Sequence, residues 1–226
     1  MKIGVLLSGC GVYDGAEIHE SVLTLLAIEE LGAEAVCMSI NADQHHVVNH
    51  INGEEQDEKR NMMVEAARIA RGNIKNITEI QPADIDMLVI PGGFGSAKNF
   101  TTWAFVGADG DILPEVKLML VNLVNIGKPI VALCVSPVVV AKAFEGSSVQ
   151  PFMTIGSDKA ESPYDINSFV EGLEQTGAKT AMKTASEINV DETNRIVTAP
   201  CYMMNTNLVT LRNNIKAAIE AGVDLI

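Results

Sequence analysis

Hydrophobic residues along this chain alternate between short, nearly continuous runs and sets spaced like one face of a helix. Residues 3–7, 86–90 and 129–133 hold the continuous runs, which are typical of strands buried on both faces of a sheet. Residues 17–31 carry apolar side chains at helical spacing, and Gly32 predicts the end of that helix. This alternation predicts an α/β fold with a mainly parallel sheet and helices on both faces.

The rest of the chain continues the same pattern of elements. The expected further elements are strands at 33–40 and 153–155 and helices at 61–71, 115–126, 136–144, 165–176 and 205–221. Residues 188–190 and 195–198 flank a polar turn, so they predict a hairpin at the sheet edge.

Two polar stretches are expected to be loops. Residues 41–60 predict a loop with short strand pieces around Val47 and Val48, and a second loop follows Gly95 with its tip at residues 107–110. No repeat, linker or low-complexity tract interrupts the chain. We therefore expect one domain that spans residues 1–226.

Composition and charge narrow the class of protein. The chain has 226 residues, 47% of them hydrophobic and 20% charged, which is the composition of a globular domain rather than a disordered chain. The net charge of -13 argues against nucleic acid and anionic lipid as partners. No apolar stretch approaches the roughly 18 to 20 residues of a membrane span. We therefore expect no nucleic-acid partner and no membrane association.

The four cysteines indicate a reducing compartment. They are far apart and form no CxxC pair, which argues against a zinc finger or a redox dithiol. The first apolar run is too short for a signal peptide. Together these features predict a cytoplasmic protein.

Cys134 is the first candidate for chemistry. It stands where a buried strand gives way to a helix that begins near Ser136 and Pro137. A nucleophile on such a tight turn is held at the sheet edge, beside a helix N-terminus whose dipole favours the thiolate. The thiolate is the form that suits covalent catalysis. The alternative is a small buried apolar residue, and position alone does not choose between the two.

The glycine-rich segment 91–95 follows another buried strand, so it should lie at the same sheet edge as Cys134. Glycine allows unusual backbone angles and close approach to a ligand. The amide of Gly93, beside Gly92, together with the amide of Val135 would form an oxyanion hole. The alternative is an ordinary turn between a strand and a helix.

Glu17 and Glu20 are three residues apart, which places both on one face of the first helix. A carboxylate near the cysteine could act as a general base, with its pKa raised by partial burial. The alternative is that both only complement the helix dipole. His19, between them, is either an acid–base partner or an exposed helical histidine.

Three further histidines raise the question of a metal site. His45, His46 and His50 fall within six residues, but they lack an HExxH frame and an acidic ligand placed with them. We therefore expect a solvated loop, no metal and no cofactor.

Together the motifs resemble those of the ThiJ/PfpI superfamily of class I glutamine amidotransferase-like proteins. Within it they are similar to the ElbB family, which is glyoxalase-like and named for isoprenoid biosynthesis. The segments that carry the likeness are SGCGVYDG at 8–15, EIHE at 17–20 and PGGFGSAKN at 91–99, with support at 53–54, 60–61, 65–68, 196–200 and 202–203. The resemblance extends over essentially the whole chain.

The resemblance implies a flavodoxin-like, doubly wound sheet and a homodimer. It implies Cys134 as the nucleophile and Glu20 as the carboxylate that contacts it, with Glu17 in reserve. The oxyanion amides would be those of Gly93 and Val135.

One difference from the sequence pattern of the superfamily limits which activities we expect for this chain. Its members usually carry a histidine soon after the strand that follows the nucleophile helix, but residues 154–158 contain none, and no histidine follows His50. This argues against amidotransferase and peptidase activity, which need that base.

A cofactor-free glyoxalase needs one base and no metal. The expected function is therefore conversion of methylglyoxal or glyoxal, both small aldehydes, to 2-hydroxy acids through a Cys134 hemithioacetal. The alternative is a binding or regulatory protein with a redox-sensitive Cys134 and little or no turnover.

Overall fold

The computed structural model describes residues 1–226 and contains a seven-stranded sheet in the order β3-β2-β1-β4-β5-β9-β8. The strands are β1 (Lys2–Leu6), β2 (Glu34–Ser39), β3 (Lys75–Asn76), β4 (Met87–Ile90), β5 (Ile130–Leu133), β8 (Asn189–Asp191) and β9 (Ile196–Ala199). All neighbouring pairs are parallel except β8 with β9. The predicted flavodoxin-like, mainly parallel sheet is confirmed.

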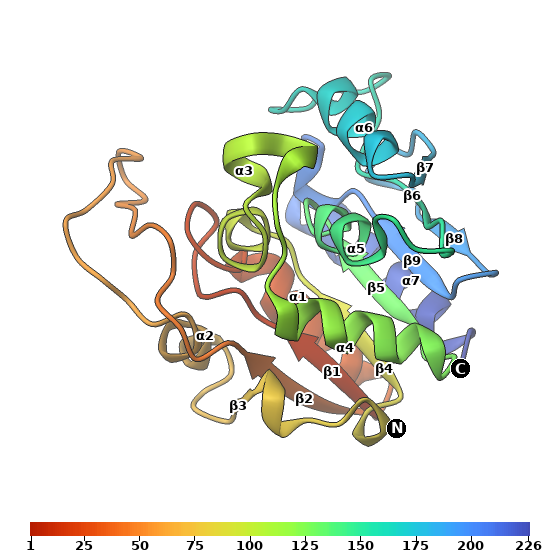
Figure 1. The fold of residues 1–226 in the computed structure, drawn as a ribbon, viewed down its shortest axis with the longest axis horizontal. Helices are drawn as coiled ribbons and strands as arrows, with labels where there is room; N and C mark the ends of the chain where they lie inside the picture. The colour runs from red at the N-terminus through yellow and green to blue at the C-terminus, as the bar shows by residue number, and fades with distance from the viewer.

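Helices cover both faces of this sheet (Figure 1). The long ones are α1 (Ile18–Glu30), α2 (Met62–Ile69), α4 (Pro114–Asn125), α5 (Pro137–Phe144) and α7 (Leu208–Val223). α1 packs against α7 and α2 on one face, and α4 packs against α5 on the other. α7 lies especially close to the sheet, since a Cβ on Gly222 would come within 2.4 Å of the Met87 sulfur.

A smaller unit adjoins the β8 edge (Figure 1). It consists of β6 (Phe152–Met153), α6 (Ile166–Gln175) and β7 (Lys179–Thr180), and β6 pairs with β7 as a separate parallel two-stranded sheet. The expected strand at residues 153–155 therefore exists in shortened form and outside the main sheet. The expected hairpin has β8 at the edge, whereas β9 is internal because it also pairs with β5.

Two loop predictions need correction. Val48 forms only an isolated bridge with Glu55 and no strand. The segment after Gly95 is not a plain polar loop, because it contains a π-helical turn at Ser96–Phe100, the short helix α3 (Trp103–Val106) and a 3-10 turn at Gly107–Asp109. Phe100 and Trp103 are buried, and their burial holds this segment against the sheet.

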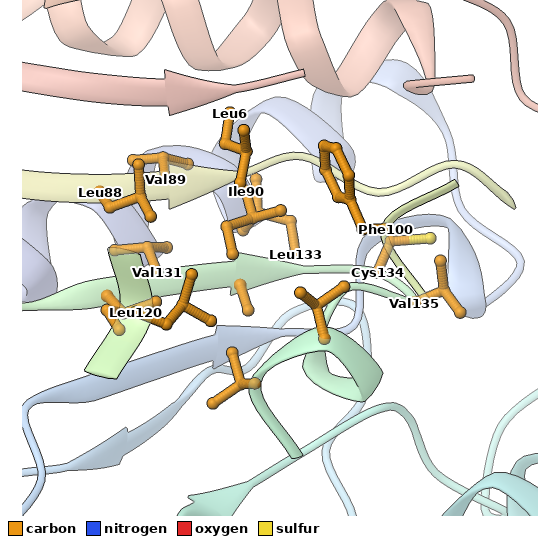
Figure 2. Packing of buried hydrophobic residues seen from close by; sticks show 14 of the residues in the cluster. Leu6, Leu88, Val89, Ile90, Phe100, Leu120, Val131, Leu133, Cys134 and Val135 are labelled. Atoms are coloured by element: carbon orange, nitrogen blue, oxygen red, sulfur yellow. The ribbon is translucent and has the colours of Figure 1, made fainter. Parts of the chain in front are cut away.

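The core is one cluster of 55 buried apolar residues. Figure 2 shows residues of β4 and β5 packed together, with Cys134 beside Phe100 and Val135 where the apolar packing reaches the end of β5. The carboxyl end of the sheet therefore joins the core directly to the candidate site. No helix is both long and apolar enough to cross a bilayer.

Candidate active site

Cys134 occupies a sharp turn directly after β5. Its backbone has φ 58, a left-handed conformation that a non-glycine residue rarely adopts. The turn is held from two sides, because the Cys134 N–H donates to the Ala199 carbonyl (2.9 Å) and the Ser136 hydroxyl donates to the Pro91 carbonyl (2.8 Å). Such a strained position persists only where its surroundings determine it, and strained residues concentrate at functional sites.

Gly92 brings the cysteine and Glu20 together. A Cβ built on Gly92 would lie 2.3 Å from the Cys134 Cβ, 2.9 Å from its sulfur and 2.6 Å from the Glu20 Oε2. The sulfur and the carboxylate therefore lie together on the side of Gly92 where a side chain would project. The Gly92 N–H also donates to the Glu20 Oε2 at 2.8 Å.

Gly92→Ala is expected to lower the free energy of unfolding by about 1–3 kcal/mol and to weaken the contact between Cys134 and Glu20, because the added methyl overpacks a buried site. Chemical denaturation measures the first effect, and the rate of Cys134 alkylation by iodoacetamide measures the second. Gly32→Ala is the control for alkylation only, since that site has open space, whereas its φ of +66 makes any side chain there lower the stability by itself. Wild-type stability and alkylation in Gly92→Ala would contradict the geometry.

Glu20 is fully buried, although it is an ionisable residue. Its Oε1 accepts the Tyr202 N–H (3.2 Å), while Oε2 accepts the Gly92 N–H. Burial, with the neighbouring charge of Glu17, raises the pKa of Glu20 to about 8, against the opposing hydrogen bonds from Tyr202, Cys134 and Gly92. A carboxyl with this pKa can hold or release a proton near neutral pH.

The pKa of the Cys134 thiol shifts in the direction opposite to the one that we expected from the helix dipole. Burial and the adjacent Glu20 carboxylate raise the pKa of Cys134 well above its usual value, and the Gly93 amide only partly opposes them. The expectation of a resting thiolate is therefore wrong, because burial outweighs the dipole of α5. The resting site holds a thiol beside a carboxyl group that can accept its proton once it is ionised.

The amides proposed for the oxyanion lie at this turn. The Gly93 N–H lies close enough to the Cys134 sulfur to oppose the rise of its pKa, and Gly93 has φ +98. A Cβ on Gly93 would approach the Gly15 carbonyl to 2.3 Å, so only glycine fits there. The Val135 N–H has no acceptor within the chain. An unpaired amide next to the sulfur is free to donate to a ligand.

Glu17 lies apart from the sulfur and caps α1. Its Oε2 accepts the Glu20 N–H at 2.7 Å, and its Oε1 lies 4.0 Å from the Nδ1 of His19. His19 in turn contacts the Tyr202 hydroxyl at 3.0 Å and has an exposed side chain. Of the two glutamates, Glu20 is therefore the one that meets Cys134, and Glu17 acts on it through charge and helix capping.

The sequence analysis assigned no role at the site to Tyr164, Cys201 or Tyr202. Cys201 is fully buried just after the end of β9, close enough to Cys134 to contribute to its raised pKa. The hairpin pattern could have placed Cys201 and Tyr202 at this edge, because β9 ends in register with β5. Nothing in the sequence pattern marks Tyr164.

The other histidines order a loop. His50 accepts the Tyr13 N–H (3.2 Å) and contacts the Val48 carbonyl, while His45 and His46 pack against Phe105. No group of three or more His, Cys, Asp or Glu residues is placed to hold a metal ion.

No family model matches the chain. It is 37% identical over 226 residues to the rat ES1 protein homolog, mitochondrial, which covers 99% of this chain and 84% of the relative. It is also 37% identical to human glutamine amidotransferase-like class 1 domain-containing protein 3, mitochondrial, with 99% of this chain and 83% of the relative covered.

Solved structures of other proteins share this fold. An isoprenoid biosynthesis protein with amidotransferase-like domain from Ehrlichia chaffeensis is 34% identical, with a TM-score of 0.89 and 100% of both chains covered. Glyoxalase III from Candida albicans shares the fold at 15% identity, with a TM-score of 0.59 and 98% and 97% of the two chains covered.

These relatives also correct one expectation. The rat, human and zebrafish relatives are named as mitochondrial proteins, which contradicts the predicted cytoplasmic location. Cysteine usage failed as a guide because it reports a reducing environment, which is not specific to one compartment. At these levels of identity and coverage, the chain belongs to the family of the ES1 proteins and the isoprenoid biosynthesis protein with amidotransferase-like domain, which confirms the expected ElbB family.

Proposed function

We propose that the protein is a cofactor-independent glyoxalase that converts methylglyoxal and glyoxal to 2-hydroxy acids in a single domain spanning residues 1–226. The observation that carries the proposal is the buried Glu20, whose pKa of about 8 lets it exchange protons next to the Cys134 thiol. The reaction needs a nucleophile and one mobile proton, and this pair supplies both.

The first step is addition of the thiol to the aldehyde. Glu20 in its carboxylate form takes the Cys134 proton while the sulfur bonds to the aldehyde carbon. The electron pair of the C=O bond moves to oxygen, where the amides of Gly93 and Val135 stabilise the charge. Return of the proton from Glu20 to this oxygen gives the hemithioacetal.

The second step moves a proton between two carbons. Glu20 removes the hydrogen of the former aldehyde carbon as a proton and returns it to the neighbouring carbon, through an enediol. The product is a thioester of the 2-hydroxy acid, and water releases the acid and restores the thiol. No external oxidant or reductant is needed, because one carbon is oxidised as its neighbour is reduced.

The test is turnover of methylglyoxal by the purified protein without glutathione or added metal, followed as lactate formation. Formation of lactate supports the proposal, and a complete absence of lactate excludes it. A binding or regulatory role is then favoured, since the raised pKa of Cys134 leaves the resting sulfur protonated and poorly nucleophilic.

A homodimer is part of the proposal. Ile18, Val22 and Leu26 recur every four residues on α1, and they form an apolar stripe with exposed fractions of 44%, 49% and 44%. An exposed stripe of this kind is typical of an interface. A second copy of the chain is the occupant that we propose.

Val22→Lys is expected to convert the dimer to a monomer of 24.2 kDa, because it places a charge in the middle of the stripe. Light scattering after size exclusion measures the mass. Leu118→Lys is the matched control, since Leu118 is exposed on α4 on the opposite face and should leave the dimer intact. A monomeric wild-type protein would contradict the proposal.

A further inference from the structure

Tyr164 packs against Phe94, the residue after Gly93, but takes no part in the mechanism above. It belongs to the loop between β6 and α6, and it is half-buried. Its ring meets the ring of Phe94 edge to face, with 5.7 Å between centroids and an interplanar angle of 77°. Phe94 directly follows Gly93, so this contact holds Tyr164 beside the glycine turn.

Hydrogen bonds fix the loop that carries Tyr164. The Tyr164 N–H donates to the Ser162 hydroxyl (3.0 Å), and that hydroxyl donates to the Met203 carbonyl (2.6 Å). The Asn205 N–H donates to the Glu161 carbonyl at 2.9 Å. The loop is therefore fastened to the turn after β9, which also supplies the Tyr202 amide to Glu20. A side chain on such a fixed loop can be preorganised for catalysis.

The hydroxyl of Tyr164 remains available as a donor. Burial first, and then the neighbouring Cys134 and Glu20, raise the pKa of Tyr164 to about 12. The hydroxyl thus stays protonated throughout the pH range in which Glu20 ionises. It makes no hydrogen bond with any group of the chain.

The chain has three tyrosines, and the other two are unsuited to this role. Tyr202 already uses its hydroxyl in the contact with His19. Tyr13 is 40% exposed, so water competes for its hydroxyl. Only Tyr164 combines a sheltered position with an unengaged hydroxyl.

We infer that the Tyr164 hydroxyl donates a hydrogen bond to the carbonyl oxygen of the substrate while the Cys134 sulfur adds to the adjacent carbon. The inference rests on the proposed function and adds a third oxyanion donor to the two amides. The sulfur electron pair forms the C–S bond, the C=O pair moves to oxygen, and the thiol proton passes through Glu20 to that oxygen. Tyr164 keeps its own proton and stabilises the charge as it develops.

The test uses Tyr164→Phe, which removes only the hydroxyl. We expect kcat/KM for methylglyoxal to fall by about 10²-fold, the usual loss for one oxyanion donor. Alkylation of Cys134 by iodoacetamide should proceed at the wild-type rate, because that reaction develops no oxyanion. Tyr13→Phe, which removes a phenol hydroxyl outside the proposed machinery, should leave both values unchanged.

A second readout separates this inference from the proposed function. Hemithioacetal formation protects Cys134 from iodoacetamide whether or not turnover follows, so the methylglyoxal concentration for half protection reports the addition step alone. A higher concentration for Tyr164→Phe than for wild type supports the inference, even if lactate never forms and the glyoxalase proposal fails. Equal protection of the two proteins, or no protection of wild type, overturns the inference.

Discussion

Cys134→Ala is expected to lower kcat for methylglyoxal by about 10³-fold or more, because the covalent route is then lost entirely. No other thiol can replace it at the site. Cys134 shares a hydrogen bond with the Glu20 carboxyl, whereas the fully buried Cys201 does not. Lactate formation under saturating methylglyoxal measures the loss.

The controls for this variant separate chemistry from folding. Cys134→Ser keeps the volume of the side chain, so a folded but inactive Ser variant assigns the loss to the sulfur. Cys10→Ser should retain wild-type turnover, since Cys10 is a free, partly buried cysteine outside the proposed mechanism. Turnover that persists in Cys134→Ala would exclude the hemithioacetal and leave a different catalytic group to be found.

The positions of Cys134, Gly93 and Glu20 could be predicted because each follows from a local pattern with a topological consequence. Cys134 and Gly93 lie just beyond buried apolar strands, and Glu20 lies in the first turn of the helix that follows another. Parallel strands bring their carboxyl ends to one edge of the sheet. The register of β1, β4 and β5 therefore assembles residues more than a hundred positions apart. The helix that contains Glu20 could be predicted from the helical spacing of its apolar residues and from Gly32 at its end.

The protonation state of Cys134 could not be predicted in the same way. The sequence shows the helix that follows the cysteine, and hence the dipole, but it does not show how completely the thiol is enclosed. The turn at Cys201 and the carboxyl of Glu20 close over it, and both come from distant parts of the chain. Desolvation depends on these tertiary neighbours, and it decides the direction of the pKa.

The position of Tyr164 was beyond prediction for a related reason. Its loop has neither helical nor strand periodicity, and it is placed by hydrogen bonds to the segment around Met203 and Asn205. The segment after Gly95 shows a similar limit, because only the buried Phe100 and Trp103 distinguish it from an ordinary polar loop. In both places, long-range packing determines a structure that local propensity leaves open.

Glu20→Gln is expected to remove a large pH dependence of stability. The pKa of Glu20 is about 8 in the folded protein, raised from 4.5 for an unperturbed glutamate, so the folded state binds the extra proton between these values. Stability from this group is therefore greatest below pH 4.5 and is lost as pH rises toward 8. Between pH 5 and 8, the wild-type protein should lose about 3 kcal/mol more than the Gln variant.

Urea denaturation at pH 5, 6.5 and 8 measures this difference. Glu115→Gln is the control, since Glu115 is exposed on α4 and should keep the wild-type slope. Only the change of stability with pH is compared. Glu20 accepts hydrogen bonds from two N–H groups, and the NH₂ of Gln would face one of them, which shifts the absolute stability. Parallel curves for wild type and Glu20→Gln would show that Glu20 ionises normally.

The same ionisation links stability to catalysis. The carboxylate that begins the reaction is the form that destabilises the fold, so kcat/KM for methylglyoxal should rise with pH through about 8 while stability falls. Glu20→Gln should lose both trends together, with kcat/KM reduced by about 10²-fold or more at all pH values. If the pH profile of activity survives in the variant, the base is another group, and burial of Glu20 then has no catalytic purpose.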